Sequence, residues 1–252
     1  MFCPHCGKEI AENQVFCQFC GGATAITVTI PGTGRSKTAW EDEPTKWTFS
    51  GLVTTLKVSL FNPSEFFRTM NVTGGLTGPM LYAMLVGMTG IMLFYFWQIV
   101  LHDTYPESLT SGLQGTTWFT MFSGVGMSVM AVITPFMIIA GVFLGSGMLH
   151  LLLLMVRGAK NGFESTFRVV AYAYGSNIFM AVPFCGGFIA ALWNIVVVII
   201  GLKEAHGISG GKAAFAVLFP LILCCAFVVL FSILVLGTVA ASFGTMPHQL
   251  WK

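Results

Sequence analysis

The sequence predicts an all-α polytopic membrane protein, with five transmembrane helices preceded by interfacial amphipathic helices and by a small four-cysteine module. Of its residues, 55% are apolar and only 9% are charged, and the mean hydropathy is +0.81. A water-soluble domain carries about 25% charged residues. Several apolar runs also exceed the roughly 18 residues that cross a bilayer. Most of the surface is therefore expected to face lipid.

The N-terminal module, residues 1–22, carries Cys3-x2-Cys6 and Cys17-x2-Cys20, ten residues apart. Two such pairs supply four thiolates, which close a tetrahedron around Zn²⁺ and leave no open position for water. We therefore expect a zinc ribbon with a structural zinc held by these four cysteines. The zinc either only folds a module too small for a core or also builds a docking site for a partner. No basic stripe is present, so no nucleic-acid partner is expected.

Two segments separate this module from the first apolar run. Residues 23–46 are rich in Thr, Gly and Pro and keep no helical period, which predicts a flexible linker. Residues 47–72 carry leucines at helical spacing, interrupted at Asn62-Pro63, with Ser64 placed to cap a second helix. We expect two short amphipathic helices that either lie in the membrane interface or pack on the end of the bundle.

We expect a membrane domain over residues 47–252. After the two short helices, its apolar runs predict five spans. We place them at about 79–101, 127–156, 167–182, 184–202 and 213–242. The third and fourth are short and separated only by Pro183 and the Cys185-Gly186-Gly187 turn, so they form a hairpin that either crosses fully or is re-entrant. Gly141-x3-Gly145 in the second span predicts a smooth face for close helix approach.

Basic residues orient the spans. Of twelve Lys and Arg, eleven fall in segments on one side and only Lys252 falls on the other. Positive charge accumulates on the cytoplasmic side of a membrane. We therefore expect a multi-pass protein of the cytoplasmic (inner) membrane, with a cytoplasmic N-terminus and the C-terminus on the outer side.

Four polar side chains within the spans are candidates for an intramembrane polar site: His150, Tyr172, Asn177 and Asn194. An ionisable or amide group at membrane depth is a functional candidate by default. The alternative is structural: His150 bonds a neighbouring helix, and Asn177 and Asn194 hydrogen-bond to each other across the hairpin.

A second candidate site lies in the cytoplasmic loops. Its members are charged or titratable side chains near the inner ends of the spans: Arg157, Glu164, Arg168, Glu204 and His206. They gather into a metal or hydrolytic site, or they only cap helices and form loop salt bridges. No carboxylate pair, His-Glu-x-x-His or Ser/His/Asp pattern lies at membrane depth, so we expect no enzyme.

Several motifs together resemble one known family. They are Phe61-Asn62-Pro63 with Phe66-Phe67, Gly162–Tyr172 (GFESTFRVVAY), Pro183, Gly186-Gly187, Trp193 and Gly201–Ser209 (GLKEAHGIS). Over about residues 50–242 the chain resembles the Yip (Ypt-interacting-protein) membrane domain, in its bacterial branch with an N-terminal zinc ribbon. The resemblance implies a five-helix membrane domain with a cytoplasmic N-terminus and transfers no catalytic set. Eukaryotic relatives associate with small GTPases in vesicle traffic, a role not carried over to a chain with a ribbon.

The function expected from these features is a membrane scaffold or adaptor. The ribbon would reach an unknown cytoplasmic protein partner, and the bundle would contact membrane lipids and self-associate as a homo-oligomer. The alternative is a transporter, channel or lipid-handling protein that uses a polar crevice between the second, third and fourth spans. A hydrated crevice favours the alternative, and a dry, closely packed bundle favours the scaffold.

Overall fold

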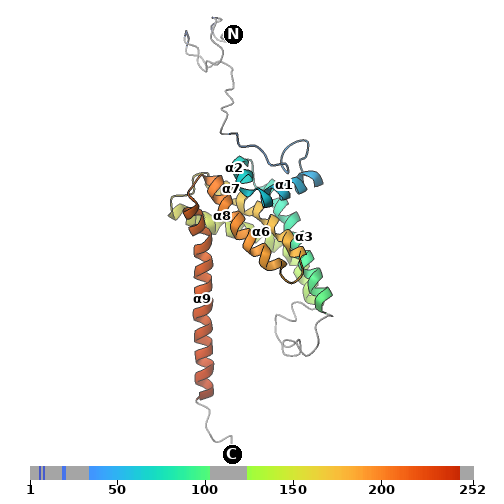
Figure 1. The fold of residues 1–252 in the computed structure, drawn as a ribbon, viewed down its shortest axis with the longest axis vertical. Coiled ribbons are helices and arrows are strands. Elements are labelled where there is room, and N and C mark those ends of the chain that lie inside the picture. Colours follow the sequence, from blue (N-terminus) through green and yellow to red (C-terminus); the bar gives the residue numbers. More distant parts are fainter. Residues whose placement is uncertain (1–5, 7, 9–18, 21–33, 103–123, 245–252) are drawn as a thin grey trace, which may run out of the picture. The chain divides into compact units, whose positions relative to one another are not determined.

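A computed structural model describes residues 6, 8, 19–20, 34–102 and 124–244 of the chain (Figure 1). Within these residues there are seven α-helices, one 3₁₀-helix and no β-strand. The chain forms two compact units, Met1–Ser36 and Lys37–Lys252, which we describe separately. The all-helical class expected for the membrane domain is thus observed. The predicted ligands Cys3 and Cys17, residues 103–123 between the first two expected spans and the tail from residue 245 lie outside the described residues.

The helices of the second unit follow one another in the order that the sequence predicts. They are α1 (Phe49–Phe61), α2 (Pro63–Thr69), α3 (Thr77–His102), α6 (Gly124–Met155), α7 (Gly162–Ala173), the 3₁₀-helix η1 (Tyr174–Ala181), α8 (Gly186–His206) and α9 (Gly210–Gly244). The two short helices expected over 47–72 correspond to α1 and α2. Asn62, rather than Ser64, is the N-cap residue of α2, because Pro63 occupies its first turn.

Four of the described helices are long and apolar enough to cross a membrane: Thr77–Gln98, Ser128–Met155, Gly186–His206 and Gly210–Val235. The third expected span, residues 167–182, is not among them. Its residues are divided between α7 and η1, since the backbone tightens into a 3₁₀ path after Ala173. α7 also carries buried polar side chains, which lower its mean hydropathy.

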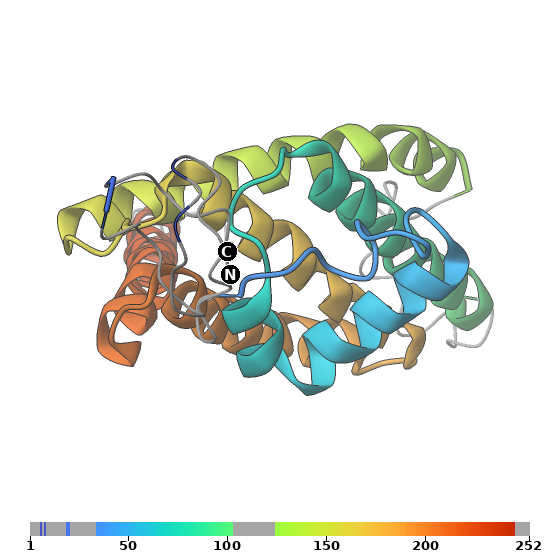
Figure 2. The ribbon, with the colours of Figure 1, turned by 90° about the horizontal axis from the view of Figure 1, so that it is seen from above.

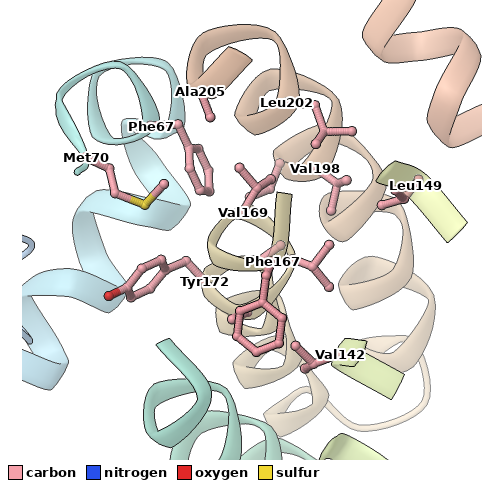
Figure 3. Close-up of a cluster of buried hydrophobic side chains, with 14 of the residues drawn as sticks. Phe67, Met70, Val142, Leu149, Phe167, Val169, Tyr172, Val198, Leu202 and Ala205 are labelled. Carbon is pink, nitrogen blue, oxygen red and sulfur yellow. The ribbon is translucent and has the colours of Figure 1, made fainter. Parts of the chain in front are cut away.

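α7 is the centre of the bundle. Every residue from Ser165 to Ala173 is buried. Seen from above, α7 lies between α6 and α8 (Figure 2). Phe67 of α2, Val169 of α7 and Leu202 of α8 are each fully buried and belong to one apolar cluster (Figure 3). Burying such side chains contributes about 1.5–3 kcal/mol each in water-soluble proteins, whereas between lipid-embedded segments close packing replaces this term.

Two glycines let α7 and η1 approach their neighbours closely. A Cβ atom at Gly90 of α3 would collide with the carbonyl group of Asn177, so the backbone of η1 rests directly on α3. A Cβ at Gly141 of α6 would lie 2.7 Å from the hydroxyl oxygen of Tyr174. Gly141 begins the small-residue face predicted for the second span, but a Cβ at Gly145, the other end of that motif, would lie 4.0 Å from Val170, an ordinary contact distance.

Residues 37–48, called the strap below, differ from the linker expected over 23–46. Trp40 is only 3% exposed, and its indole Nε1 donates a 2.8 Å hydrogen bond to the carbonyl of Gly78. Its backbone N–H donates to Thr55 Oγ1 of α1 at 3.0 Å. Beneath the strap, a Cβ at Gly51 would lie 2.7 Å from the carbonyl oxygen of Ala39. The strap is therefore part of the membrane domain, whereas residues 23–33 lie outside the described part.

Candidate functional site: two polar clusters at one end of the bundle

The ends of α6 and α8 and the starts of α3 and α7 lie at one end of the bundle (Figure 1). α1 and α2 lie at the same end. Two separate clusters form there, and both include residues of α7. We call them the strap cluster (Thr38, Glu41, Arg168 and Tyr172) and the histidine cluster (His150, Asn161, Thr166 and His206).

The strap cluster joins the strap to α7. Glu41 forms an ion pair with Arg168 and accepts a 2.9 Å hydrogen bond from the Tyr172 hydroxyl. Thr38 Oγ1 donates to the same carboxylate oxygen at 3.2 Å and lies 3.0 Å from the Tyr172 hydroxyl. One carboxylate oxygen, Oε2, thus accepts from three side chains, one in the strap itself and two on α7.

Burial makes this pairing necessary. The Arg168 side chain is 1% exposed and that of Glu41 is 12% exposed. A buried guanidinium without a counter-charge costs several kcal/mol, so Arg168 requires the Glu41 carboxylate. Arg168 Nη1 also donates to the carbonyl of Gly75 at 3.0 Å, and the N–H of Gly75 donates to Glu164 Oε1 at 2.6 Å. These bonds fix the loop between α2 and α3 against α7.

The histidine cluster joins the ends of α6, α7 and α8. The backbone N–H of Asn161 donates to Nδ1 of His206 at 3.2 Å, so this nitrogen is an acceptor and we assign the proton of His206 to Nε2. Nε2 then donates to Thr166 Oγ1 at 3.0 Å. The Thr166 hydroxyl proton points to Nδ1 of His150 at 3.0 Å. One hydroxyl therefore links two neutral imidazoles.

Asn194 serves the junction between α7 and η1. Its Nδ2 donates to the carbonyl of Ala173 at 3.0 Å and to Ser176 Oγ at 3.1 Å. A carbonyl at the end of an α-helix lacks its usual partner, and an amide from α8 supplies one here. Asn194 therefore bonds to this junction rather than to Asn177, the partner expected from the sequence. Asn177 itself contacts α3 through its backbone.

The four residues proposed for an intramembrane polar site are consequently not brought together. His150 belongs to the histidine cluster, Tyr172 to the strap cluster, and Asn194 to the α7–η1 junction. Each of these three forms hydrogen bonds with protein groups, and their partners lie on different elements.

The five loop residues are also divided. Arg168 and Glu164 meet at Gly75, whereas His206 bonds Thr166. Glu204 accepts hydrogen bonds from Ser64 at 3.0 Å and from Lys203 at 2.9 Å. Arg157 is exposed in the turn after α6, with a φ of 51°.

Sequence reasoning did not single out four of the cluster residues: Thr38, Glu41, Asn161 and Thr166. Glu41 belongs to the acidic group in the expected linker, and its basic partner lies 127 residues away. Thr166 lies in the GFESTFRVVAY motif that carries the family resemblance. Two signals in the sequence could have found Thr166 and Glu41. The GFESTFRVVAY motif contains Thr166, and Trp40, a large apolar residue in a mostly polar segment, directly precedes Glu41.

In the N-terminal unit, two of the four predicted zinc ligands are described. Cys6 and Cys20, the second member of each pair, are both exposed. The Lys8 ammonium lies 4.8 Å from the centroid of the Phe19 ring, so the neighbourhoods of the two pairs are in contact. Among the described residues no group of three His, Cys, Asp or Glu side chains gathers, as two of the predicted ligands lie outside them. The donor set, four cysteines in two pairs, suits tetrahedral Zn²⁺.

These features define a helical membrane domain with an appended ribbon of metal-binding type. Residues 57–240 match the Yip1 domain, and residues 2–23 match a zinc-ribbon domain. Because the Yip1 match spans more than half of the chain, the protein belongs to the Yip1 domain family, and the resemblance seen in its motifs is confirmed. No curated protein and no solved structure matches the chain.

Proposed function

We propose that this chain is an integral membrane scaffold or adaptor, whose zinc ribbon docks a cytoplasmic protein partner and whose helical bundle organises the membrane or self-associates. The main support for the proposal is that polar side chains of the bundle hold protein segments together. Thr38, Glu41, Arg168 and Tyr172 bind the strap to α7 through one carboxylate. The domain therefore has a fixed platform next to the segment that leads to the ribbon.

The hydrogen bonds of α7 and α8 favour this function over transport. A solute path needs polar groups that face a shared aqueous space, whereas Thr166 Oγ1 lies between His150 and His206 and Asn194 holds the α7–η1 junction. These groups stabilise contacts between helices. No catalytic role is part of the proposal, and the Yip1 domain is not a known enzyme family.

The topology belongs to the same proposal. At about 1.5 Å per residue in an α-helix and about 2.0 Å in a 3₁₀-helix, α7 and η1 together rise about 34 Å, enough for a fifth crossing. Five crossings, with the basic end on the cytoplasmic side of the inner membrane, place the ribbon inside the cell and the C-terminus outside. The apolar window of α9 is 0% buried, so this helix faces lipid or a second copy.

Site-specific photo-crosslinking from the ribbon tests the docking role. A photoreactive residue in place of Lys8, in the full chain in native membranes, is expected to give one discrete protein adduct. Cys6→Ser should abolish the adduct, because zinc binding folds the ribbon. Asn194→Ala, which alters only the bundle, should retain it.

A conductance measurement tests the competing function. Purified protein in planar bilayers is expected to leave the K⁺ and Na⁺ conductance at the lipid background. An absent adduct, together with a conductance that His150→Ala or Asn194→Ala removes, would overturn the scaffold in favour of a pore.

A further inference from the structure

A polar cavity of 210 Å³ opens beside the strap cluster. The strap, the loop between α2 and α3, the start of α3 and one side chain of α7 form its walls. Its lining residues are Lys37, Glu41, Lys46, Trp47, Asn71, Thr73, Gly74, Thr77, Gly78 and Arg168. All of its lining residues belong to the membrane domain and none to the histidine cluster, and binding in the cavity is an activity beyond the docking role proposed for the ribbon.

The charge of the lining is positive. Three cationic side chains, Lys37, Lys46 and Arg168, face one carboxylate, that of Glu41. Oε2 of this carboxylate already accepts from Arg168, Tyr172 and Thr38. Lys37 and Lys46 are exposed, and Lys46 lies 3.9 Å from the exposed Glu43, a weak surface pair. The charge remaining in the cavity therefore attracts an anion.

Hydrogen-bond donors converge on one wall. Arg168 Nε is buried and has no partner among the described residues. At Gly74, where φ is 133° and no side chain intervenes, a Cβ would lie 3.6 Å from Asn71 Nδ2 and 3.8 Å from Arg168 Nη1. The Nδ2 amide of Asn71 and the Nη1 of Arg168 thus lie beside the space that Gly74 leaves open, and an acceptor oxygen bound there is within reach of both donors.

Exposed aromatic groups place the cavity at a membrane surface. Trp47 lines the cavity and is 55% exposed, and the adjoining Phe49 of α1 is 80% exposed. Val53, one turn further along α1, is 43% exposed. Aromatic and aliphatic side chains of an interfacial helix insert at the level of the lipid headgroups. A cationic cavity beside them lies at the depth of the lipid phosphates.

We propose that this cavity binds a phosphate group, with Arg168 and Asn71 donating hydrogen bonds to its oxygens and Lys37 and Lys46 balancing its charge. The group is supplied either by an anionic lipid headgroup or by a soluble phosphate compound. A guanidinium that donates from more than one nitrogen matches the geometry of a phosphate better than that of a monatomic anion.

Native mass spectrometry of the full chain in detergent tests the proposal. The probe is phosphatidylglycerol, titrated against phosphatidylcholine as the zwitterionic reference, and a second arm measures the melting shift caused by inorganic phosphate. The test variant is the pair Lys37→Gln and Lys46→Gln, since both side chains are exposed and neither holds the strap cluster. The matched control is the pair Lys57→Gln and Lys212→Gln, also exposed but outside the cavity lining.

We expect the cavity pair to weaken phosphatidylglycerol binding about tenfold or more, with the control pair within about twofold, because each Lys near the headgroups contributes about 1 kcal/mol. This result assigns a lipid as the source. A melting shift with inorganic phosphate that only the cavity pair loses assigns a soluble phosphate compound instead. Equal effects of the two pairs in both arms, or no binding by the parent protein, would overturn the phosphate site.

Discussion

The Tyr172 hydroxyl of α7 donates a 2.9 Å hydrogen bond to Oε2 of Glu41, across 131 residues of sequence. The bond connects the most buried helix of the bundle to a segment whose composition is that of a linker. The Tyr172 ring packs against Phe66 at 5.3 Å and Tyr82 at 5.0 Å between centroids. The ring and its hydroxyl therefore have separable roles, one in packing and one in holding the strap.

Tyr172→Phe keeps this ring packing and removes only the hydroxyl, with its hydrogen bonds to Glu41 and Thr38. We expect the free energy of unfolding to fall by about 1.5–3 kcal/mol, the range for a bond to a charged group. Chemical denaturation in micelles measures it. Tyr95→Phe, at a half-buried ring of α3, serves as the control and should change stability by no more than about 0.5 kcal/mol. Equal effects of the two substitutions would contradict the role assigned to Tyr172.

A double-mutant cycle tests the ion pair between Arg168 and Glu41. Arg168→Leu leaves the Glu41 carboxylate without its counter-charge, and we expect a loss of about 3–5 kcal/mol. Adding Glu41→Gln to Arg168→Leu should recover part of the loss, because the second substitution removes the uncompensated charge. Additive losses in the double variant would show that the pair is not coupled.

Lys203→Ala tests an exposed ion pair, for comparison with the buried pair of Arg168 and Glu41. Lys203 pairs with Glu204 at 2.9 Å, but its side chain is 49% exposed. Surface pairs contribute about 0–1 kcal/mol, so the substitution should lower the melting temperature little. A loss as large as that of Arg168→Leu would mean that burial does not decide the strength of these pairs.

Gly90→Ala and Gly147→Ala form a matched pair on two membrane-spanning helices. A Cβ at Gly90 collides with the Asn177 carbonyl, whereas a Cβ at Gly147 meets no atom within 4 Å. Overpacking against backbone costs about 1–3 kcal/mol or more, and alanine has the higher helix propensity where there is space. Melting in detergent should therefore show a clear loss for Gly90→Ala and none for Gly147→Ala. The reverse order would mean that η1 does not rest on α3.

Thr166→Val keeps the shape of the side chain and removes the hydroxyl that links His150 to His206. We expect a loss of about 1–3 kcal/mol, because buried polar atoms lose a partner. His150→Ala combined with Thr166→Val should cost less than the sum of the two single losses, since both remove the same bond. Strict additivity in chemical denaturation would indicate that the two groups do not interact.

The membrane helices could largely be predicted from the sequence, because apolar runs longer than about 18 residues carry a local signal. α3, α6 and α9 begin and end within a few residues of the expected spans. α7 and η1 could not be separated in this way. At their junction the Ala173 carbonyl accepts from Ser176 and from the amide of Asn194, and the second bond forms only when α8 packs against α7 in the folded bundle.

The strap shows a second limit of sequence reasoning. Its composition predicts a linker, and the contacts that order it come from Gly78, Arg168 and Tyr172, between 38 and 131 residues away. Hydrophobic periodicity within a short segment does not predict contacts with such distant residues. The polar residues of the spans can be singled out from the sequence, but which of them meet depends on helix packing, which a single sequence does not specify.

Zinc removal separates the two units of the chain. Cys6→Ser should lower the zinc content, measured by atomic emission, from one ion per chain to well below one. The melting temperature of the membrane domain should stay unchanged, because the ribbon and the bundle are distinct compact units. A melting temperature that falls together with the zinc content would show that the metal also supports the bundle.

Hydrogen exchange measures whether the strap is held against the bundle in solution. In lipid nanodiscs, the amides of Trp40 and Trp47, which donate to Thr55 Oγ1 and to the Trp40 carbonyl, should exchange far more slowly than in an unstructured peptide. Glu41→Gln should accelerate both, while the amides of α6 stay protected. Exchange at unstructured-peptide rates in the parent protein would contradict a strap that is fixed to the bundle, and with it the platform on which the scaffold function is built.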